Sequence, residues 1–455
     1  MPAEMPDLDT LAADHRPVTA AQALPVSPRL TDADNSLFTR PRMGIAILVV
    51  LAILAAISAI QFQAPHLLGA EKSLTDYDAF HIAGLLALDG RAEDAYRFET
   101  MLAAQQEFTG TVSMMPWTYP PPFTLFVAGM ANLPIGLGFL LFIVSTLAMY
   151  LVVLRRIAGV YWPGVLIVML PTLPLLMRTG QNGFLAGALT GLFLLAFLQR
   201  KPGAGLPLGL MIIKPHLAVA MAVMTLVERR WQTVMIAAVT VAIALLIPSL
   251  VFGLSIWPAF FDGIAQSGDF LARGEYKLYR MTSLYAAAHT LGAGPALAMA
   301  IQAAGALGAI AAMLAARMRK LAPHRLAAAI CCATLFISPY GYDYDLTIFG
   351  LAVAFVLPDL LQRTRPLEQI GMVALVWLGT GYGLVRSLSV ETISPASAMA
   401  GAVAADQFLS VMGPVLLIVI ALGTHILARA PHPDEDVARP GNGLRPGVLP
   451  AAPAA

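Results

Sequence analysis

The sequence predicts an all-α fold, that of a polytopic helical membrane protein. Its 455 residues are 58% hydrophobic and only 12% charged, and the mean hydropathy is +0.74. Soluble domains contain roughly 45–50% apolar and about 25% charged residues. Apolar runs of about 17–25 residues, the length needed to cross a bilayer as a helix, recur almost from end to end.

The first predicted span is 43–61, preceded by Arg40 and Arg42. A cleaved signal peptide is the rival interpretation, but the long polar, proline-rich lead-in favours an uncleaved span. Segment 204–227 is interrupted by Lys214-Pro215-His216, and proline removes a backbone donor within a helix. We therefore expect two shorter helices meeting there, and about 11–12 membrane helices in all. The remaining predicted spans are 134–154, 160–177, 183–198, 232–253, 294–316, 325–338, 345–361, 370–389 and 407–428.

Basic residues predict the orientation. If 204–227 enters and leaves on one side, every basic cluster falls on the cytoplasmic side, as the positive-inside rule requires. Both termini are then cytoplasmic, and two large outer loops, 62–121 and 254–293, face the other side. The domain prediction is a disordered tail over 1–42, a transmembrane domain over 43–428 and a disordered tail over 429–455. The clusters are Arg40/Arg42, Arg155/Arg156, Arg200/Lys201, Arg229/Arg230, Arg317/Arg319/Lys320/Arg325 and Arg363/Arg365.

Several classes of protein are excluded by composition and motif. The net charge is +1, which gives no reason to expect nucleic acid as a partner. Cys331 and Cys332 are adjacent within an apolar run, so a disulfide framework is excluded. The predicted cytoplasmic connections are short, and no Walker motif or GxGxxG stands between a strand and a helix, so ATP and NAD are not expected.

The stretch TDYDAFHIAGLLALDG, 75–90, gathers Asp76, Asp78 and His81 just beyond the first span. It predicts a short amphipathic helix at the membrane interface, with an apolar face of Ala79, Ile82, Ala83 and Leu86. Two residues apart on a helix means about 200°, so Asp76 and Asp78 cannot share a face. Each of these residues also has a purely structural interpretation. Asp76 would cap the helix, Asp78 would be solvated, and His81 would pack against its neighbours.

Other polar residues stand at the ends of spans or inside them. Tyr119, in MPWTYPPPF, fits an interfacial aromatic belt. Arg178 either extends to the interface or contacts an anion. Lys214 lies within an apolar run, where an ionisable residue is a functional candidate, and its positive charge suits a phosphate contact. In SPYGYDYD, interfacial anchoring explains the tyrosines better than it explains Asp343 and Asp345.

Five motifs, in order over about residues 40–430, resemble glycosyltransferase family 87 of the GT-C superfamily. They are D-Y-x-x-F-x-x-A-G-x-x-x-L-x-G, Y-P-P-P-F, G-Q-N, G-L-x-x-x-K-P-H and S-P-Y-x-Y-D-Y-D. The resemblance implies a GT-C-like fold and transfer of a sugar, often mannose, from a polyprenyl-phosphate carrier. The acceptor would be a lipid or glycan on the periplasmic face of a bacterial inner membrane.

The resemblance also implies roles for individual residues. The family's first-loop aspartate falls on Asp76, which would take the acceptor's proton in an inverting displacement. Lys214, Arg178 and His216 are candidates for the donor phosphate. The supporting candidates for acceptor or sugar are Asp78, His81, Tyr119, Gln181, Tyr342, Asp343 and Asp345. No metal and no cofactor are expected, because cations can balance the phosphate charge and the lipid-linked sugar is a substrate.

One departure from the family is notable. Actinobacterial mannosyltransferases of this family carry histidines in a W-D-H-H-like run, where this chain has Tyr342-Asp343-Tyr344-Asp345. The acceptor of this protein can therefore differ from the acceptor of those enzymes. Two rival functions remain at this point: a transporter or flippase of lipid-linked sugars, and an oligosaccharide ligase or polymerase. The first would need internal repeats, and the second would favour a large outer loop late in the chain.

Overall fold

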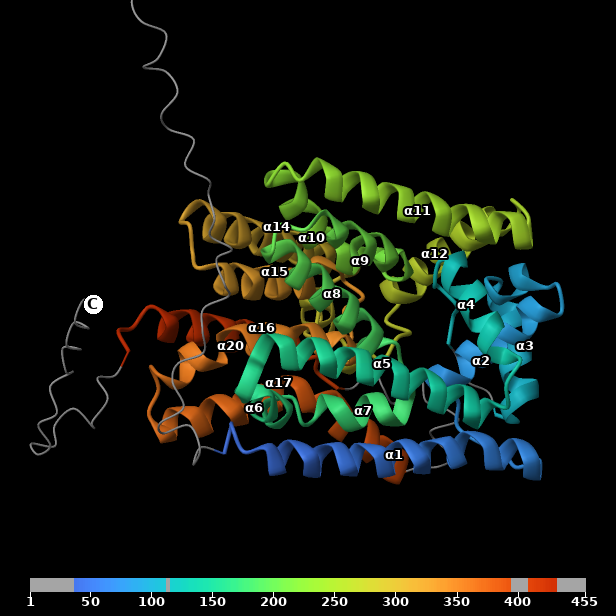
Figure 1. Ribbon diagram of the computed structural model, residues 1–455. Helices are drawn as coiled ribbons and strands as arrows, with labels where there is room; N and C mark the ends of the chain where they lie inside the picture. Colours follow the sequence, from blue (N-terminus) through green and yellow to red (C-terminus); the bar gives the residue numbers. More distant parts are fainter. Residues whose placement is uncertain (1–36, 112–114, 394–407, 432–455) are drawn as a thin grey trace, which may run out of the picture.

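The computed structural model describes residues 37–111, 115–393 and 408–431 (Figure 1). Within these residues the chain is nearly all helical, and its extended pairing is limited to one bridge between Met281 and Tyr342. The predicted fold class is thereby confirmed. The predicted tails, 1–42 and 429–455, lie almost entirely outside the described residues.

Long apolar helices form the body of the protein. In the described part of the chain, six helical segments are long and apolar enough to cross a membrane, and six shorter apolar helices accompany them. The long segments contain α1 (Pro41–Leu68), α5 (Ile135–Ala158) with α6 (Trp162–Val168), α11 (Trp231–Phe252), α14 (Pro295–Met318), η8 (Asp343–Leu346) with α16 (Thr347–Leu361), and α17 (Pro366–Ile393). The shorter ones contain α4 (Pro121–Ala131), α8 (Gly183–Leu198), α9 (Gly205–Leu210), α10 (Pro215–Val227), α15 (Pro323–Ile337) and α20 (Met412–Leu427).

Burial differs between the centre and the edge of this body. Helix α16 is enclosed, with Ile348 and Leu351 fully buried. Helix α11 lies along one edge of the body (Figure 1) and leaves apolar side chains such as Leu250 uncovered, 76% exposed. An uncovered apolar helix flank of this kind is suited to lipid rather than to water.

The first outer loop folds into helices at one end of the body, where α2 (Asp76–Leu88) and α3 (Phe98–Thr109) lie beside α4 (Figure 1). The predicted apolar face of α2 is buried, but so are Tyr77, Asp78, Phe80 and Ala87. The prediction of an interfacial helix with one face to water is therefore wrong. The aromatic ring of Phe80 is the reason, because it packs among Trp117, Tyr119 and Phe123 and gives α2 a second buried face.

Two helical segments are interrupted. The structure confirms two shorter helices, α9 and α10, meeting at Lys214-Pro215. It corrects the prediction of one span over 160–177, because α6 ends at Val168 and α7 (Thr172–Thr179) begins after a break. Pro171 has no backbone donor, and the ring of Pro174 would clash with the carbonyl four residues earlier, so one continuous helix is disfavoured.

Several of the basic clusters lie close to one another in the helical body. Arg317 pairs with Glu228, and Arg230 donates to the carbonyl of Phe197. Arg325 pairs with Asp359 and donates to the carbonyl of Leu427. These contacts bring together the helix ends that the positive-inside rule assigns to a single side, as the predicted topology requires.

Candidate active site

Asp76 is the first residue of α2, and capping is performed by its neighbours. The backbone N–H and the hydroxyl of Thr75 both donate to Oδ2 of Asp78, at 2.9 and 3.0 Å. This arrangement closes the start of the helix in the manner of a capping box. Asp76 is therefore not needed as a cap, and its side chain points to the other side of the helix, as the 200° separation predicts.

The two carboxylate oxygens of Asp76 differ in environment. Oδ1 accepts a hydrogen bond from Nε2 of Gln181 at 3.0 Å. Oδ2 is buried and has no hydrogen-bond partner. An unpaired buried oxygen costs free energy unless a ligand or water uses it, so Oδ2 is available to accept a hydrogen bond from a bound donor group.

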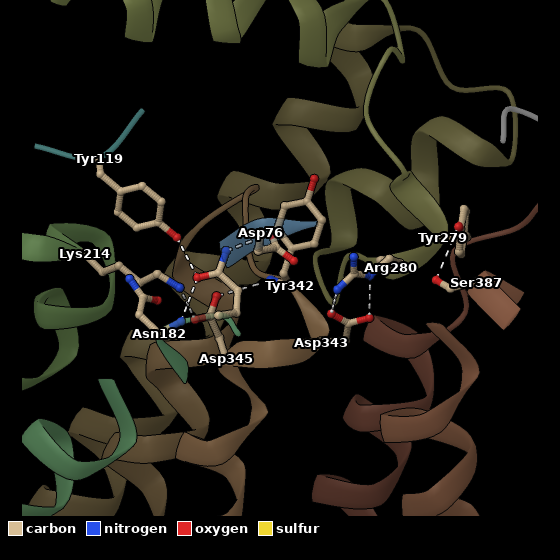
Figure 2. Close-up of polar contacts among 11 residues, drawn as sticks. Asp76, Tyr119, Asn182, Lys214, Tyr279, Arg280, Tyr342, Asp343, Asp345 and Ser387 are labelled. Atoms are coloured by element: carbon tan, nitrogen blue, oxygen red, sulfur yellow. Dashed lines mark hydrogen bonds and ion pairs between the residues drawn. The ribbon is translucent and has the colours of Figure 1, made fainter. Parts of the chain in front are cut away.

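Gln181 holds the orientation of Asp76. Its Oε1 accepts from the hydroxyl of Tyr119 and from the backbone N–H of Asn182, both at 2.8 Å. Because two donors face one end of the amide, that end must be the oxygen, and the NH₂ group must face Asp76. Figure 2 shows this chain of contacts from Tyr119 to Asp76.

The turn around Gln181 depends on two glycines. Gly180 ends α7 in the left-handed conformation, with φ of 67°, which only glycine adopts without strain. A Cβ on Gly183 would lie 2.0 Å from the backbone oxygen of Tyr344. Gly183 thus allows the start of α8 to approach η8, which brings the Gln181 turn next to the Tyr342–Asp345 segment.

The Tyr342–Asp345 segment supplies two carboxylates, each paired with a cation. Asp343 makes a two-pronged ion pair with Arg280, with both N–O distances 2.9 Å. Asp345 accepts from Nζ of Lys214 at 2.7 Å. All four side chains are nearly excluded from solvent. Figure 2 shows Asp76 between these two pairs.

Arg280 is a site residue that sequence reasoning missed. It follows GEYKLY in the second outer loop, and the sequence does not reveal that this loop returns to the Tyr342–Asp345 segment through the Met281–Tyr342 bridge. Burial acts to lower the pKa of Arg280, but the charge and hydrogen bonds of Asp343 raise it overall, and the charge of Asp76 adds to that effect. Arg280 is thus a permanent cation within electrostatic reach of Asp76.

Aromatic rings line the same region. The rings of Tyr342 and Tyr344 stack with centroids 5.1 Å apart, and Nζ of Lys214 lies 4.4 Å from the centroid of Tyr344. Burial raises the pKa of Tyr119 well above its ordinary value, and the charge of Asp76 adds to the rise, while contacts with Gln181 and Asn182 oppose it. Tyr119 is therefore a neutral hydrogen-bond donor at physiological pH.

The structure brings together Asp76, Tyr119, Gln181, Lys214 and the Tyr342–Asp345 segment, but it places Asp78 and His81 elsewhere. Asp78 pairs with Lys72 at 2.5 Å on the far side of α2. Burial raises the pKa of Asp78, whereas Lys72 and Thr75 act to lower it. His81 stacks at an angle on Phe108, with centroids 5.7 Å apart, and lines a small apolar pocket with Tyr77 and Phe126.

The remaining candidates for the donor phosphate, His216 and Arg178, are close in the sequence to Lys214 and Gln181. His216 follows Lys214 and Pro215 in the first turn of α10, and its Nε2 is buried without a hydrogen-bond partner. Arg178 stands in the last turn of α7, three residues before Gln181. No group of three or more His, Cys, Asp or Glu side chains in the described residues is arranged to hold a metal ion.

Fold and site together define a multi-pass membrane protein with a buried, charged cluster at one end of its helices. The family model of glycosyltransferase family 87 matches residues 117–339. The match supports the assignment of the chain to glycosyltransferase family 87, and together with the apolar helices it indicates a membrane glycosyltransferase. The matched range includes Tyr119, Gln181, Lys214 and Arg280, whereas Asp76 precedes it. No curated protein and no solved structure matches the chain significantly.

Proposed function

We propose that the protein transfers a sugar, a hexose such as mannose, from a polyprenyl-phosphate carrier to a lipid or glycan acceptor. Transfer proceeds with inversion, and Asp76 is the general base. The observation that carries the proposal is the asymmetry of the Asp76 carboxylate, whose Oδ1 is held by Gln181 while Oδ2 is buried and unpaired. A general base needs this combination of fixed orientation and a free lone pair.

The acceptor hydroxyl oxygen attacks the anomeric carbon, and its proton passes to Oδ2 of Asp76. The bond between the anomeric carbon and the phosphate oxygen breaks, and the electron pair leaves with the polyprenyl phosphate. Attack opposite to the leaving group inverts the configuration of the anomeric carbon.

The leaving phosphate requires positive charge. Lys214 uses one of its three N–H donors on Asp345, so two remain for phosphate oxygens. In a site from which water is excluded, such donors stabilise the charge that develops on the leaving group. His216 and Arg178 are further candidates for the same group, and the proposal requires no metal.

The arrangement of the helices supports a periplasmic location of the site. Helix α8 begins beside the cluster and ends next to Arg200, and α15 begins next to Arg325 and ends near the cluster. The site is therefore at the end of these helices opposite to the basic clusters. With the basic ends in the cytoplasm of a bacterium, the site opens toward the periplasm.

The test is sugar transfer by the purified enzyme, and by the enzyme expressed in membranes that lack the native one. A panel of polyprenyl-phosphate sugars is offered as donors, and the products are identified by mass analysis. Asp76→Asn should lower the transfer rate by about 10²–10⁴-fold or more, because the amide cannot accept the proton. Asp89→Asn is the matched control, since Asp89 is exposed at the end of the same helix. Transfer by Asp76→Asn at the wild-type rate would rule out Asp76 as the base. A product with retained anomeric configuration would rule out the inverting step.

A further inference from the structure

Asn182 is a buried amide without partners. Its side chain is fully excluded from solvent, and neither Oδ1 nor Nδ2 makes a hydrogen bond. Leaving a single buried donor or acceptor unpaired is costly, and this residue leaves both. The mechanism above uses only its backbone, whose N–H donates to Gln181.

The surroundings of Asn182 are those of the proposed site. It follows Gln181, the residue that orients Asp76. Its side chain lies close enough to the Tyr119 hydroxyl to act to lower the pKa of that phenol, but the contact does not have hydrogen-bond geometry, and the hydroxyl proton is donated to Gln181. Figure 2 shows Asn182 within the cluster formed by Asp76, Lys214 and Asp345. The unpaired amide and the unpaired Oδ2 of Asp76 thus belong to one region of the protein.

The two unpaired atoms of Asn182 specify the chemistry of a ligand. An amide side chain offers an acceptor and a donor side by side, whichever way it is turned. A hydroxyl both donates and accepts, so a pair of hydroxyls can satisfy both atoms at once. A phosphate at neutral pH only accepts, so it would leave the amide oxygen unpaired and facing negative charge. The amide is therefore matched to a polyhydroxylated ligand rather than to the phosphate.

We infer that Asn182 binds a pair of hydroxyls on a sugar ring in the active site and contributes to sugar specificity. The inference rests on the proposed function and deepens it, because it assigns the recognition of hydroxyls to Asn182 and leaves the phosphate to Lys214. The sugar ring belongs to the donor or to a glycan acceptor, and the experiment distinguishes these two sources.

The variant Asn182→Ala is suited to the test, because alanine keeps the backbone N–H that holds Gln181. Asn132→Ala is the matched control, since Asn132 is an exposed amide at the end of α4. Asn182→Asp is a second variant of the same size, which keeps an acceptor and loses the donor. Thermal unfolding of each purified variant shows whether it is folded.

The assay compares the kcat/KM of wild type and variants with the best polyprenyl-phosphate sugar of the panel and with its monodeoxy analogues. The kcat/KM of wild type should fall roughly 10- to 100-fold when the hydroxyl that contacts Asn182 is removed from the sugar. The kcat/KM of Asn182→Ala with the parent sugar should be lower than that of wild type by a similar factor. It should not fall further when the variant is given that monodeoxy analogue. A second arm repeats the comparison with monodeoxy acceptors.

The outcomes separate cleanly. If Asn182→Ala uses a monodeoxy donor as well as the parent donor, whereas wild type does not, Asn182 binds the donor sugar. If the same holds for a monodeoxy acceptor, Asn182 binds the acceptor sugar. The inference is overturned if folded Asn182→Ala still transfers sugar and loses as much kcat/KM as wild type with every monodeoxy donor and acceptor. The proposed function would then still stand. If no polyprenyl-phosphate sugar supports transfer by wild type, the proposed function fails, and the inference fails with it.

Discussion

At the scale of single residues, the ion pair of Lys214 and Asp345 determines how Lys214 can be tested. Both side chains are buried, with exposed fractions of 4% and 1%. Removing one member of such a pair leaves a buried charge without a partner, which typically costs about 3–5 kcal/mol. A variant of Lys214 alone would therefore mix a loss of stability with any loss of donor binding.

We predict that Lys214→Ala raises the apparent KM for the lipid donor by roughly 10- to 100-fold, the value of a charge-assisted hydrogen bond to phosphate. The double variant Lys214→Ala with Asp345→Asn removes the uncompensated carboxylate, so it should recover thermal stability while the donor KM stays high. Lys201→Ala, at an exposed position in a basic loop, should leave both quantities unchanged. A wild-type donor KM in the double variant would remove Lys214 from the phosphate site.

Individual site residues were predictable from the sequence where their chemistry was conspicuous or where a family motif included them. Lys214 stood out because a lysine in an apolar run is costly, and the structure places it in the cluster. Asn182 and Arg280 did not stand out, since a polar residue in a turn and an arginine in a loop are ordinary. Their positions in the cluster depend on tertiary contacts: the burial of the Asn182 amide and the return of the second outer loop to Asp343.

At the scale of elements, helical phase separates the polar residues of α2 into two groups. Asp76 faces Gln181, whereas Asp78 and His81 face Lys72 and Phe108. The sequence predicted this separation because it follows from the pitch of a helix alone. It did not predict how deeply α2 is buried, which depends on rings contributed by residues 117–123.

His81 should make the stability of the protein depend on pH. Burial, followed by the charges of His66 and Lys72, lowers its pKa from 6.5 to about 4. Between these two values the unfolded chain binds a proton that the folded protein does not, so stability falls as pH falls through this range. The loss attributable to His81 is at most about 3 kcal/mol between pH 7 and pH 4, and less to the extent that water reaches the ring.

The measurement is the unfolding temperature in detergent between pH 7 and pH 4.5. His81→Phe should lose less stability than wild type over this range, because phenylalanine keeps the contact with Phe108 but does not titrate. His425→Phe, which changes an exposed histidine of α20, should follow the wild-type curve. Parallel curves for wild type and His81→Phe would contradict the assignment.

Most predicted membrane spans agree with the observed helices to within a few residues, but helices inside the predicted outer loops, such as α3 and α12 (Ile256–Ala272), were not predicted from the sequence. The other exceptions have physical causes. Long apolar runs such as α1 and α14 are defined by the thickness of a bilayer. The break between α6 and α7 was missed because the apolar run continues across Pro171 and Pro174, and hydropathy does not register a missing backbone donor. The break at Lys214-Pro215 was found because a charge accompanied the proline.

At the scale of the whole molecule, the site is assembled from segments that are far apart in the chain. Its residues come from the start of α2, the segment before α4, the turn between α7 and α8, the break before α10, the second outer loop and η8. These contacts cannot be derived from local sequence patterns. The order of motifs in family 87 indicates that the segments belong together, and the structure supplies the geometry.

The point at which this assembly is most sensitive is the approach of Gly183 to Tyr344. A methyl group at position 183 would lie 2.0 Å from the backbone oxygen of Tyr344 and 2.8 Å from the side chain of Leu176. A backbone oxygen cannot move aside as a flexible side chain can, so Gly183→Ala must separate α8 from η8. We predict a loss of stability of about 1–3 kcal/mol. The loss of sugar transfer should be larger than this destabilisation explains, because Gln181 moves away from the Tyr342–Asp345 segment.

Gly203→Ala is the matched control, since a Cβ at that position meets nothing within 4 Å. It should leave both the unfolding temperature and the transfer rate at their wild-type values. Transfer by Gly183→Ala is measured well below its unfolding temperature, so that reduced activity reports the geometry of the site rather than the fraction of folded protein. If folded Gly183→Ala transferred sugar at the wild-type rate, contact between α8 and η8 would not be required to hold Gln181 and Asp76 in place. The position of Asp76 would then depend on α2 and on its hydrogen bond with Gln181, without support from η8.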